Sequence, residues 1–247
     1  MDIKYKYYYF PSIFNKKLCE ETIDYGNSII ENNIKNNVNV VGVVGDNVKP
    51  NKKLSLPQNE KTLENLIDEG SSLEDIKENF YVRDSNVCFF NDEKYYDLIK
   101  PFVIEANEKS GWKYDFDVCE AIQFTVYRPG GFYGWHTDGG SDHHDKYNFS
   151  TITETKNEKK YTNCLDYVGK IRKLSLTINL SDPNTYEGGN LKFDLGPHSE
   201  KRIITCEEIR PQGSMVVFPS YVHHAVTPVT SGVRYSLVIW VLGYPFR

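Results

Sequence analysis

Two side chains that could bind a metal ion together stand one residue apart in the second half of the chain. His136 and Asp138 end a segment whose aromatic residues predict a β-strand. Alternate residues of a strand project from the same face, so this spacing directs an imidazole and a carboxylate toward one point. An H-x-D tripeptide alone is weak evidence, because chance occurrences in solvated loops are common.

A third ligand could come from the last part of the chain, where His223 and His224 are adjacent. A distant histidine would complete a two-histidine, one-carboxylate face with open coordination positions, which is the arrangement of non-heme Fe(II) oxygenases. Neighbouring residues on a strand face opposite sides, so only one of the two histidines can reach a shared metal. Spacing alone leaves the choice between them open.

Five blocks of sequence occur in a fixed order around these residues: QFTVY at 123–127, GWHTD at 134–138, LSLTINLSD at 174–182, YEGG at 186–189 and HAVTPV at 224–229. As a set they are specific. Over about residues 80 to 244, the sequence resembles the prolyl 4-hydroxylase-like family of Fe(II)/2-oxoglutarate-dependent dioxygenases, and within it the bacterial and phage hydroxylases.

The resemblance implies a role for each matching residue. It makes His136 and Asp138 the proximal metal ligands, and the H-x-V-T-P-V pattern selects His224 as the distal one. Arg234 follows His224 by ten residues, at the position of the cation that binds the distal carboxylate of 2-oxoglutarate. The planar guanidinium suits a carboxylate. Animal and plant prolyl 4-hydroxylases typically carry Lys there, a departure that bears on the substrate and not on the co-substrate.

Three more residues are candidates for co-substrate binding. Tyr133 matches a family tyrosine that contacts 2-oxoglutarate, and Ser236 is placed like the serine of the R-x-S pair in other 2-oxoglutarate enzymes. Tyr127, together with Trp240, is a candidate to line the pocket. Their structural alternatives are a core aromatic or a capping hydroxyl. No catalytic side chain beyond the metal ligands is expected.

The resemblance also implies the reaction. Fe(II), 2-oxoglutarate and O2, with ascorbate as a further candidate, would hydroxylate an unactivated C–H bond and release succinate and CO2. A peptidyl prolyl residue or a small amino-acid-like molecule is the expected substrate, selected by loops at 32–60 and 139–170. The alternatives are a non-catalytic jelly-roll module that binds a small ligand or a metal, and, less favoured, a nucleic-acid demethylase.

The composition of the chain argues against nucleic acid and membranes as binding partners. A net charge of -5 and a pI near 5.7 provide no basic surface for nucleic acid. Five scattered cysteines indicate neither a disulfide framework nor a zinc cage. Without a signal peptide or an apolar stretch of about 18 residues, a cytoplasmic protein with no membrane partner is expected.

The pattern of residues predicts a single α+β domain over 1–247. From residue 117 onward, short β-branched and aromatic segments alternate with Gly, Pro, Asn and Asp, which favours a double-stranded β-helix, or jelly roll. We expect strands at 120–127, 133–137, 173–180, 190–194, 202–206, 214–218 and 233–241. Gly188 and Gly189 are candidates for positive φ, and 139–170 is expected to be a flap.

Residues 1–116 are expected to be a mainly helical support region, with its helices packed on one sheet of the 117–247 core. Asn15 can cap a helix over 16–31, and further helices are predicted at 61–68 and 72–80. The loop at 32–60 is expected to hold a short strand at 38–44. An apolar stripe from Tyr95 to Ala106 has helical spacing, which Pro101 should kink or interrupt.

Overall fold

The computed structural model describes residues 4–42, 83–139, 146–147, 152–155, 158–161, 165–197, 199 and 201–246. The helices predicted at 61–68 and 72–80, most of the 32–60 loop and part of the 139–170 flap lie outside these ranges. Within the predicted strand at 38–44, Val41 forms an isolated bridge to Asn86. None of the described helices is long and apolar enough to cross a membrane.

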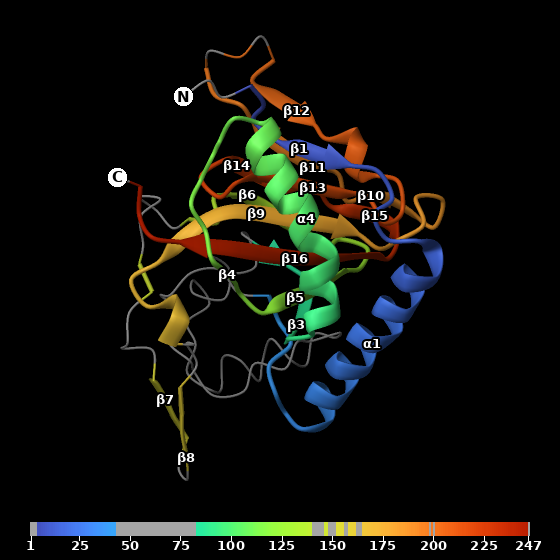
Figure 1. Ribbon diagram of the computed structural model, residues 1–247. Coiled ribbons are helices and arrows are strands. Elements are labelled where there is room, and N and C mark those ends of the chain that lie inside the picture. Colours follow the sequence, from blue (N-terminus) through green and yellow to red (C-terminus); the bar gives the residue numbers. More distant parts are fainter. Residues whose placement is uncertain are drawn as a thin grey trace.

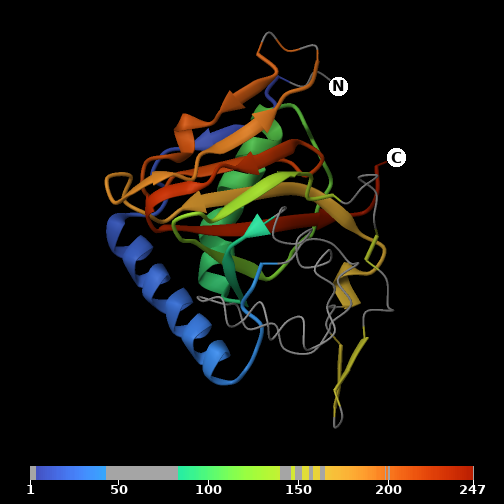
Figure 2. The same cartoon turned by 180° about the vertical axis from the view of Figure 1, so that it is seen from behind.

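Two antiparallel sheets form the body of the molecule (Figures 1 and 2). The major sheet has the order β1 (Tyr8–Phe10), β13 (Met215–Pro219), β9 (Ile171–Asn179), β16 (Arg234–Gly243), β5 (Ile122–Tyr127) and β3 (Asn86–Phe90), and β4 (Val118–Cys119) pairs with β16. The minor sheet has the order β12 (Ile203–Thr205), β11 (Leu191–Asp194), β14 (His223–Val226), β6 (Phe132–His136) and β2 (Arg83–Asp84). This is the expected α+β double-stranded β-helix, without a closed barrel.

Shorter elements complete the described fold. The strands β10 (Tyr186–Gly188) and β15 (Val229–Gly232) pair with each other, and β7 (Ile152–Thr155) pairs with β8 (Glu158–Tyr161) inside the expected flap. Two single 3-10 turns, η1 (Leu165–Tyr167) and η2 (Glu207–Ile209), follow β8 and β12. All seven predicted strands are present with ends shifted by at most two residues, whereas the short strands between them were not predicted.

The helix α1 (Lys16–Lys35) packs on the outer face of the major sheet. It begins at Asn15, whose side-chain oxygen accepts a hydrogen bond from the Leu18 amide at 2.9 Å, as predicted. Gly26 faces the sheet so closely that a Cβ there would lie 2.5 Å from the Phe124 ring. Absence of a side chain at Gly26 therefore lets the helix approach β5.

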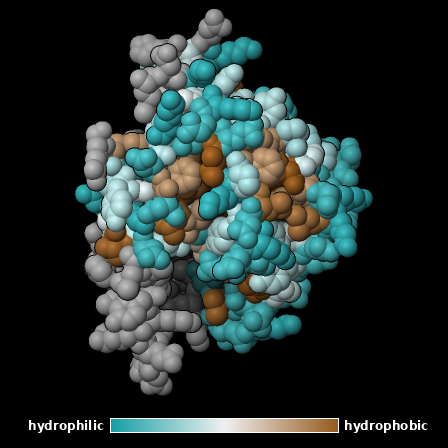
Figure 3. All heavy atoms as spheres, viewed as in Figure 1, coloured by the Kyte–Doolittle hydropathy of each residue, from teal (hydrophilic) through white to brown (hydrophobic). Residues whose placement is uncertain are grey.

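The second helix, α4 (Glu93–Lys109), crosses the same face of the major sheet in Figure 1. It continues through Pro101, so the interruption that this residue could have caused does not occur. Asp97 and Pro101 are both exposed, so water can solvate the Asp97 carbonyl that lacks its helical donor. Hydrophilic side chains surround the scattered apolar areas on this face in Figure 3, which is the usual state of a solvated surface.

The main hydrophobic core lies between these helices and the major sheet, and a second cluster lies between the two sheets. The largest fully buried side chain of the main core, Trp112, donates its indole N–H to the Tyr5 carbonyl at 2.9 Å. The second cluster includes Phe193 of β11 and Phe218 of β13. These packed layers give the inner face of the minor sheet a rigid support.

Candidate metal centre

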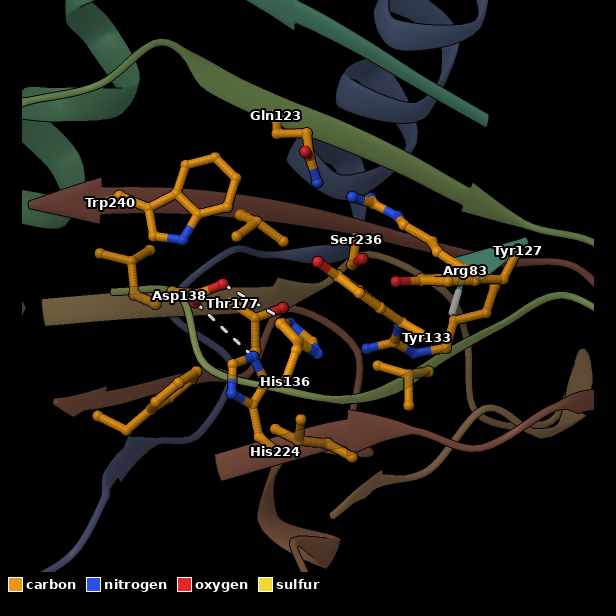
Figure 4. Close-up of a pocket in the computed structure, with 16 residues that line it drawn as sticks. Arg83, Gln123, Tyr127, Tyr133, His136, Asp138, Thr177, His224, Ser236 and Trp240 are labelled. Atoms are coloured by element: carbon orange, nitrogen blue, oxygen red, sulfur yellow. Dashed lines mark ion pairs between the residues drawn. The ribbon is translucent and has the colours of Figure 1, made fainter. Parts of the chain in front are cut away.

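Neighbouring strands of the minor sheet bring the three predicted ligands together. His136 is the last residue of β6 and lies directly opposite His224 of β14 in the antiparallel register. Asp138 follows β6, where its backbone N–H donates to the Ser220 carbonyl at 2.9 Å. Figure 4 shows the three side chains pointing toward one another from these strands.

The geometry of the three side chains fits a single ion. Nε2 of His136 lies 3.6 Å from Oδ1 of Asp138, and Nε2 of His224 lies 3.7 Å from Oδ2. The ligand atoms all lie within 4.8 Å of one another, and the three side chains are no more than 8% exposed. Two imidazoles and one carboxylate on one face form a donor set suited to Fe(II) with open positions.

Backbone hydrogen bonds set the orientation of both imidazoles. Nδ1 of His136 lies 2.8 Å from the Gly134 carbonyl, and Nδ1 of His224 lies 2.9 Å from the Val222 carbonyl. A carbonyl oxygen only accepts, so each Nδ1 carries the proton and each Nε2 presents a lone pair toward Asp138. This support is typical of metal-binding histidines.

The electrostatics keep these groups in the protonation states that a metal requires. Burial, with His136 nearby, lowers the pKa of His224 to about 4, so its imidazole is neutral at physiological pH. Burial alone would raise the pKa of Asp138, but the histidines and Arg172 outweigh it and hold that pKa below the usual range. A neutral imidazole beside an ionised carboxylate can bind a cation without first losing a proton.

His223 lies outside this group. It is exposed, opposite Asp194 in the register, and its ring lies 5.9 Å from the Trp135 ring. Of the two adjacent histidines, the structure thus places His224 at the centre. The other three histidines of the chain, His143, His144 and His198, lie outside the described residues.

A pocket between the two sheets opens beside the three side chains (Figure 4). Its lining includes the four predicted co-substrate residues, Tyr127, Tyr133, Arg234 and Ser236. Trp240 lines it as well. Arg234 is 2% exposed, and its guanidinium carbon lies 5.5 Å from the centre of the Tyr127 ring. A buried guanidinium in the same pocket as the candidate ligands can bind an anionic group.

Gly189 provides the space in which Arg234 lies. As predicted, both Gly188 and Gly189 have positive φ, at 71° and 60°. A Cβ at Gly189 would lie 2.8 Å from Cδ of Arg234 and 3.0 Å from Val229. This position therefore needs glycine for its backbone and for the arginine beside it.

Tyr133 packs directly on a candidate ligand. Its ring stacks on the His136 imidazole with centroids 3.5 Å apart and an angle of 11° between the planes. Burial is the main cause that raises the pKa of Tyr133 above its ordinary value, so the hydroxyl keeps its proton. It can therefore donate a hydrogen bond in the pocket.

Sequence reasoning missed a charged pair that supports this centre. Arg172 of β9 makes two hydrogen bonds to Glu120, at 2.6 and 2.7 Å, and Nη1 donates to the Asp138 carbonyl at 3.2 Å. Its guanidinium carbon lies 3.9 Å from the Trp240 ring, and Tyr147 donates to Glu120 at 2.6 Å. Arg172 lies directly before the strand predicted at 173–180 and next to Lys173, so its local sequence did not distinguish it from a solvated charge.

A second missed residue, Arg83, is also buried and lines the pocket. It stands at the start of the described chain after the gap at 43–82, in a two-residue strand with no periodic pattern. No sequence signal separated it from a solvated arginine.

The chain resembles known proteins over the part that contains this centre. Residues 122–242 match the 2OG-Fe(II) oxygenase superfamily. A PKHD-type hydroxylase from Synechococcus sp. (strain CC9605) is 45% identical over 74 residues, which cover 30% of this chain and 31% of that protein. The chain spans about a third of the length of the curated relatives that it matches.

Two solved structures show the same fold. The viral collagen prolyl hydroxylase from Paramecium Bursaria Chlorella virus-1, in a 2OG complex, aligns with a TM-score of 0.51 and 15% identity over 97% of each chain. A prolyl hydroxylase from Trichoplax adhaerens, in complex with a hypoxia inducible factor peptide fragment, aligns with a TM-score of 0.52 and 13% identity, over 96% of this chain and 83% of that one. The resemblance expected from the sequence is confirmed.

Proposed function

We propose that this chain, whose residues 122–242 match the 2OG-Fe(II) oxygenase superfamily, is a single-domain Fe(II)- and 2-oxoglutarate-dependent dioxygenase. It hydroxylates an unactivated C–H bond of a peptidyl prolyl residue or a small amino-acid-like molecule, with release of succinate and CO2. The observation that carries the proposal is the buried His136, Asp138 and His224 face, which opens into a pocket that also contains Arg234.

His136, Asp138 and His224 would hold the iron through two Nε2 atoms and a carboxylate oxygen. The bound iron, 2-oxoglutarate and O2 supply the oxidising chemistry, so no side-chain general base is needed. The chain holds the ligands in one orientation through the backbone acceptors of both imidazoles. Apolar lining residues such as Phe218 and Leu176 limit the access of water.

Arg234 would bind the distal carboxylate of 2-oxoglutarate. It begins β16, and Ser236 lies two residues further on the same face of the strand, so both side chains reach the pocket. The protonated Tyr133 hydroxyl and the Tyr127 ring complete the polar and aromatic surroundings of this end. Ascorbate stays a prediction from the resemblance, and the cytoplasmic location stays a prediction from the sequence.

A peptide is one of the two substrate classes considered. The Trichoplax adhaerens neighbour was solved with a peptide fragment, and the viral neighbour is a collagen prolyl hydroxylase. At such low identity these structures indicate the fold of this chain and not its substrate specificity. A screen must therefore include peptides and free amino acids.

The test is substrate-dependent succinate formation by the iron-loaded protein in a screen of prolyl peptides and amino acids. We expect His136→Ala, Asp138→Ala and His224→Ala each to abolish it. His223→Ala is the matched control, because this neighbour is exposed and faces away, and it should retain activity. Loss of activity in His223→Ala with retention in His224→Ala would overturn the ligand assignment. An inactive, folded, iron-loaded wild type would favour a non-catalytic binding module.

A further inference from the structure

Arg83 is a second buried arginine in the pocket. It lies on β2, the edge strand of the minor sheet, and is 5% exposed. Nε donates to Ser85 Oγ at 2.8 Å, and the guanidinium carbon lies 4.5 Å from the centre of the Tyr133 ring. In Figure 4 Arg83 lies beside Tyr127 and Tyr133 among the residues that line the pocket. The ring and the hydroxyl thus hold the guanidinium in one orientation.

Part of this guanidinium has no partner. Among the residues that the structure describes, the buried Nη2 of Arg83 has no hydrogen-bond partner and no ion pair involves Arg83. A buried donor without an acceptor costs about 1–3 kcal/mol, and more when it is charged. Arg172, the other missed arginine, is by contrast fully engaged by Glu120 and the Asp138 carbonyl. Arg83 therefore has a donor without a partner among the described residues, on a side chain that lines the pocket.

The charges around the pocket indicate what would bind there. Among the described lining residues, Arg83 and Arg234 each carry one positive charge and Asp138 one negative charge. Fe(II) would add two positive charges, and the 2-oxoglutarate dianion would cancel two. One positive charge is then left over, and an unpaired charge in such a site is unfavourable. A single carboxylate on the substrate would balance it.

The two arginines occupy different places. Arg234 stands on the major sheet beside Gly189, whereas Arg83 comes from the minor sheet and lies against Ser85 and Gly42. A Cβ at Gly42 would lie 2.5 Å from Nε of Arg83, so the chain leaves room for this arginine as it does for Arg234. The separate supports indicate separate ligands, since 2-oxoglutarate has only one distal carboxylate.

We infer that Arg83 is a specificity-determining residue that binds a carboxylate of the substrate. This inference rests on the proposed function and narrows its substrate class to molecules with an anionic group near the hydroxylated carbon. A free amino acid or a peptide C-terminus supplies a main-chain carboxylate, and an acidic residue beside the target supplies a side-chain one. The chemistry at Arg83 is the same for both.

The test uses the full chain loaded with Fe(II) and 2-oxoglutarate without O2. The probes are N-acetyl-L-amino acids and their matched carboxamides, beginning with N-acetyl-L-proline and N-acetyl-L-prolinamide. The amides of Asp and Glu keep only the side-chain carboxylate, so they separate the two sources. Binding is followed as a change in the visible band of the iron chelate, and the unfolding temperature of each variant verifies that it is folded.

We expect a carboxylate probe to bind at least roughly 30-fold more tightly than its carboxamide, as for a buried charge pair that loses one partner. Arg83→Gln should weaken that probe by a similar factor and leave the affinity for 2-oxoglutarate within about threefold, while Arg83→Lys keeps part of the binding. Arg202→Gln is the matched control, because this exposed arginine pairs with Asp194 away from the pocket.

Three results would overturn the inference: carboxamides without any carboxylate that bind as well as the matched acids, a panel in which no carboxylate binds, or an Arg83→Gln variant that loses 2-oxoglutarate instead of the probe. Failure of the proposed function looks different. In that case the chelate band does not form in the folded wild type, before any probe is added.

Discussion

Removal of the Glu120 carboxylate should destabilise the protein much more than removal of the Asp194 carboxylate, whose arginine partner is exposed to solvent. Glu120 accepts two hydrogen bonds from Arg172, at 2.6 and 2.7 Å, and one from the Tyr147 hydroxyl at 2.6 Å. Glu120→Ala would leave the Arg172 guanidinium without its counter-charge between the Trp240 ring and the Asp138 carbonyl. The pair of Arg172 and Glu120 thus connects segments that meet next to the candidate metal centre.

The magnitude follows from the burial of this pair. Loss of one partner from a fully buried ion pair costs about 3–5 kcal/mol. The side chains of Arg172 and Glu120 are 25% and 12% exposed, so water screens part of the charge and the lower end applies. About 3 kcal/mol in a domain of this size corresponds to a decrease of roughly 6–12 °C in the unfolding temperature.

The assay is thermal unfolding of the metal-free protein, followed by circular dichroism at neutral pH. Asp194→Ala is the matched control, because Asp194 also accepts two hydrogen bonds from an arginine, and the side chain of that arginine, Arg202, is 64% exposed to solvent. Exposed pairs contribute little, so this variant should unfold close to the wild type. Equal decreases for Glu120→Ala and Asp194→Ala, or a decrease below about 2 °C for Glu120→Ala, would refute the reasoning.

Three further predictions concern the pocket and the metal. Arg234→Ala should raise the KM for 2-oxoglutarate by roughly 30-fold or more with little change in kcat, measured by succinate formation, because the lost contact is remote from the reacting atoms. Gly189→Ala should raise the same KM, since its Cβ would lie 2.8 Å from Cδ of Arg234, whereas Gly196→Ala, with φ of 85° and nothing within 4 Å, should lower only the unfolding temperature. Metal at about 100 times its Kd should stabilise the wild type by about 2.7 kcal/mol in thermal unfolding. It should stabilise His223→Ala by the same amount and His224→Ala far less. Loss of this stabilisation in His223→Ala would contradict the ligand assignment.

The strands that carry the site were predictable because their patterns are local. The alternation in β5, β9 and β16 reflects the two faces of a buried strand, and Asn15 satisfies the first amides of α1 within four residues of sequence. Short pairings such as β2 and β14 have too few residues for a period. Their positions depend on partners that are distant in the sequence, as for Arg83 opposite Tyr133.

The candidate metal ligands could be predicted for the same reason, while their supporting residues could not. His136 and Asp138 share a strand end, and the pattern after His224 is a specific block. The contact between Arg172 and Glu120 joins residues 52 apart, and nothing in either local sequence selects the other. Such long-range charge pairs depend on the tertiary fold, so the spacing of residues in a single sequence does not identify them.

The most direct test of the central claim is the anaerobic addition of Fe(II) and then 2-oxoglutarate to the folded wild-type protein, followed by visible absorption. Chelation of 2-oxoglutarate by an iron held by His136, Asp138 and His224 should produce a weak charge-transfer band. That band should persist in His223→Ala and be lost in His224→Ala. No band in a folded, iron-loaded wild type would contradict the assignment of this site as a 2-oxoglutarate-binding iron centre.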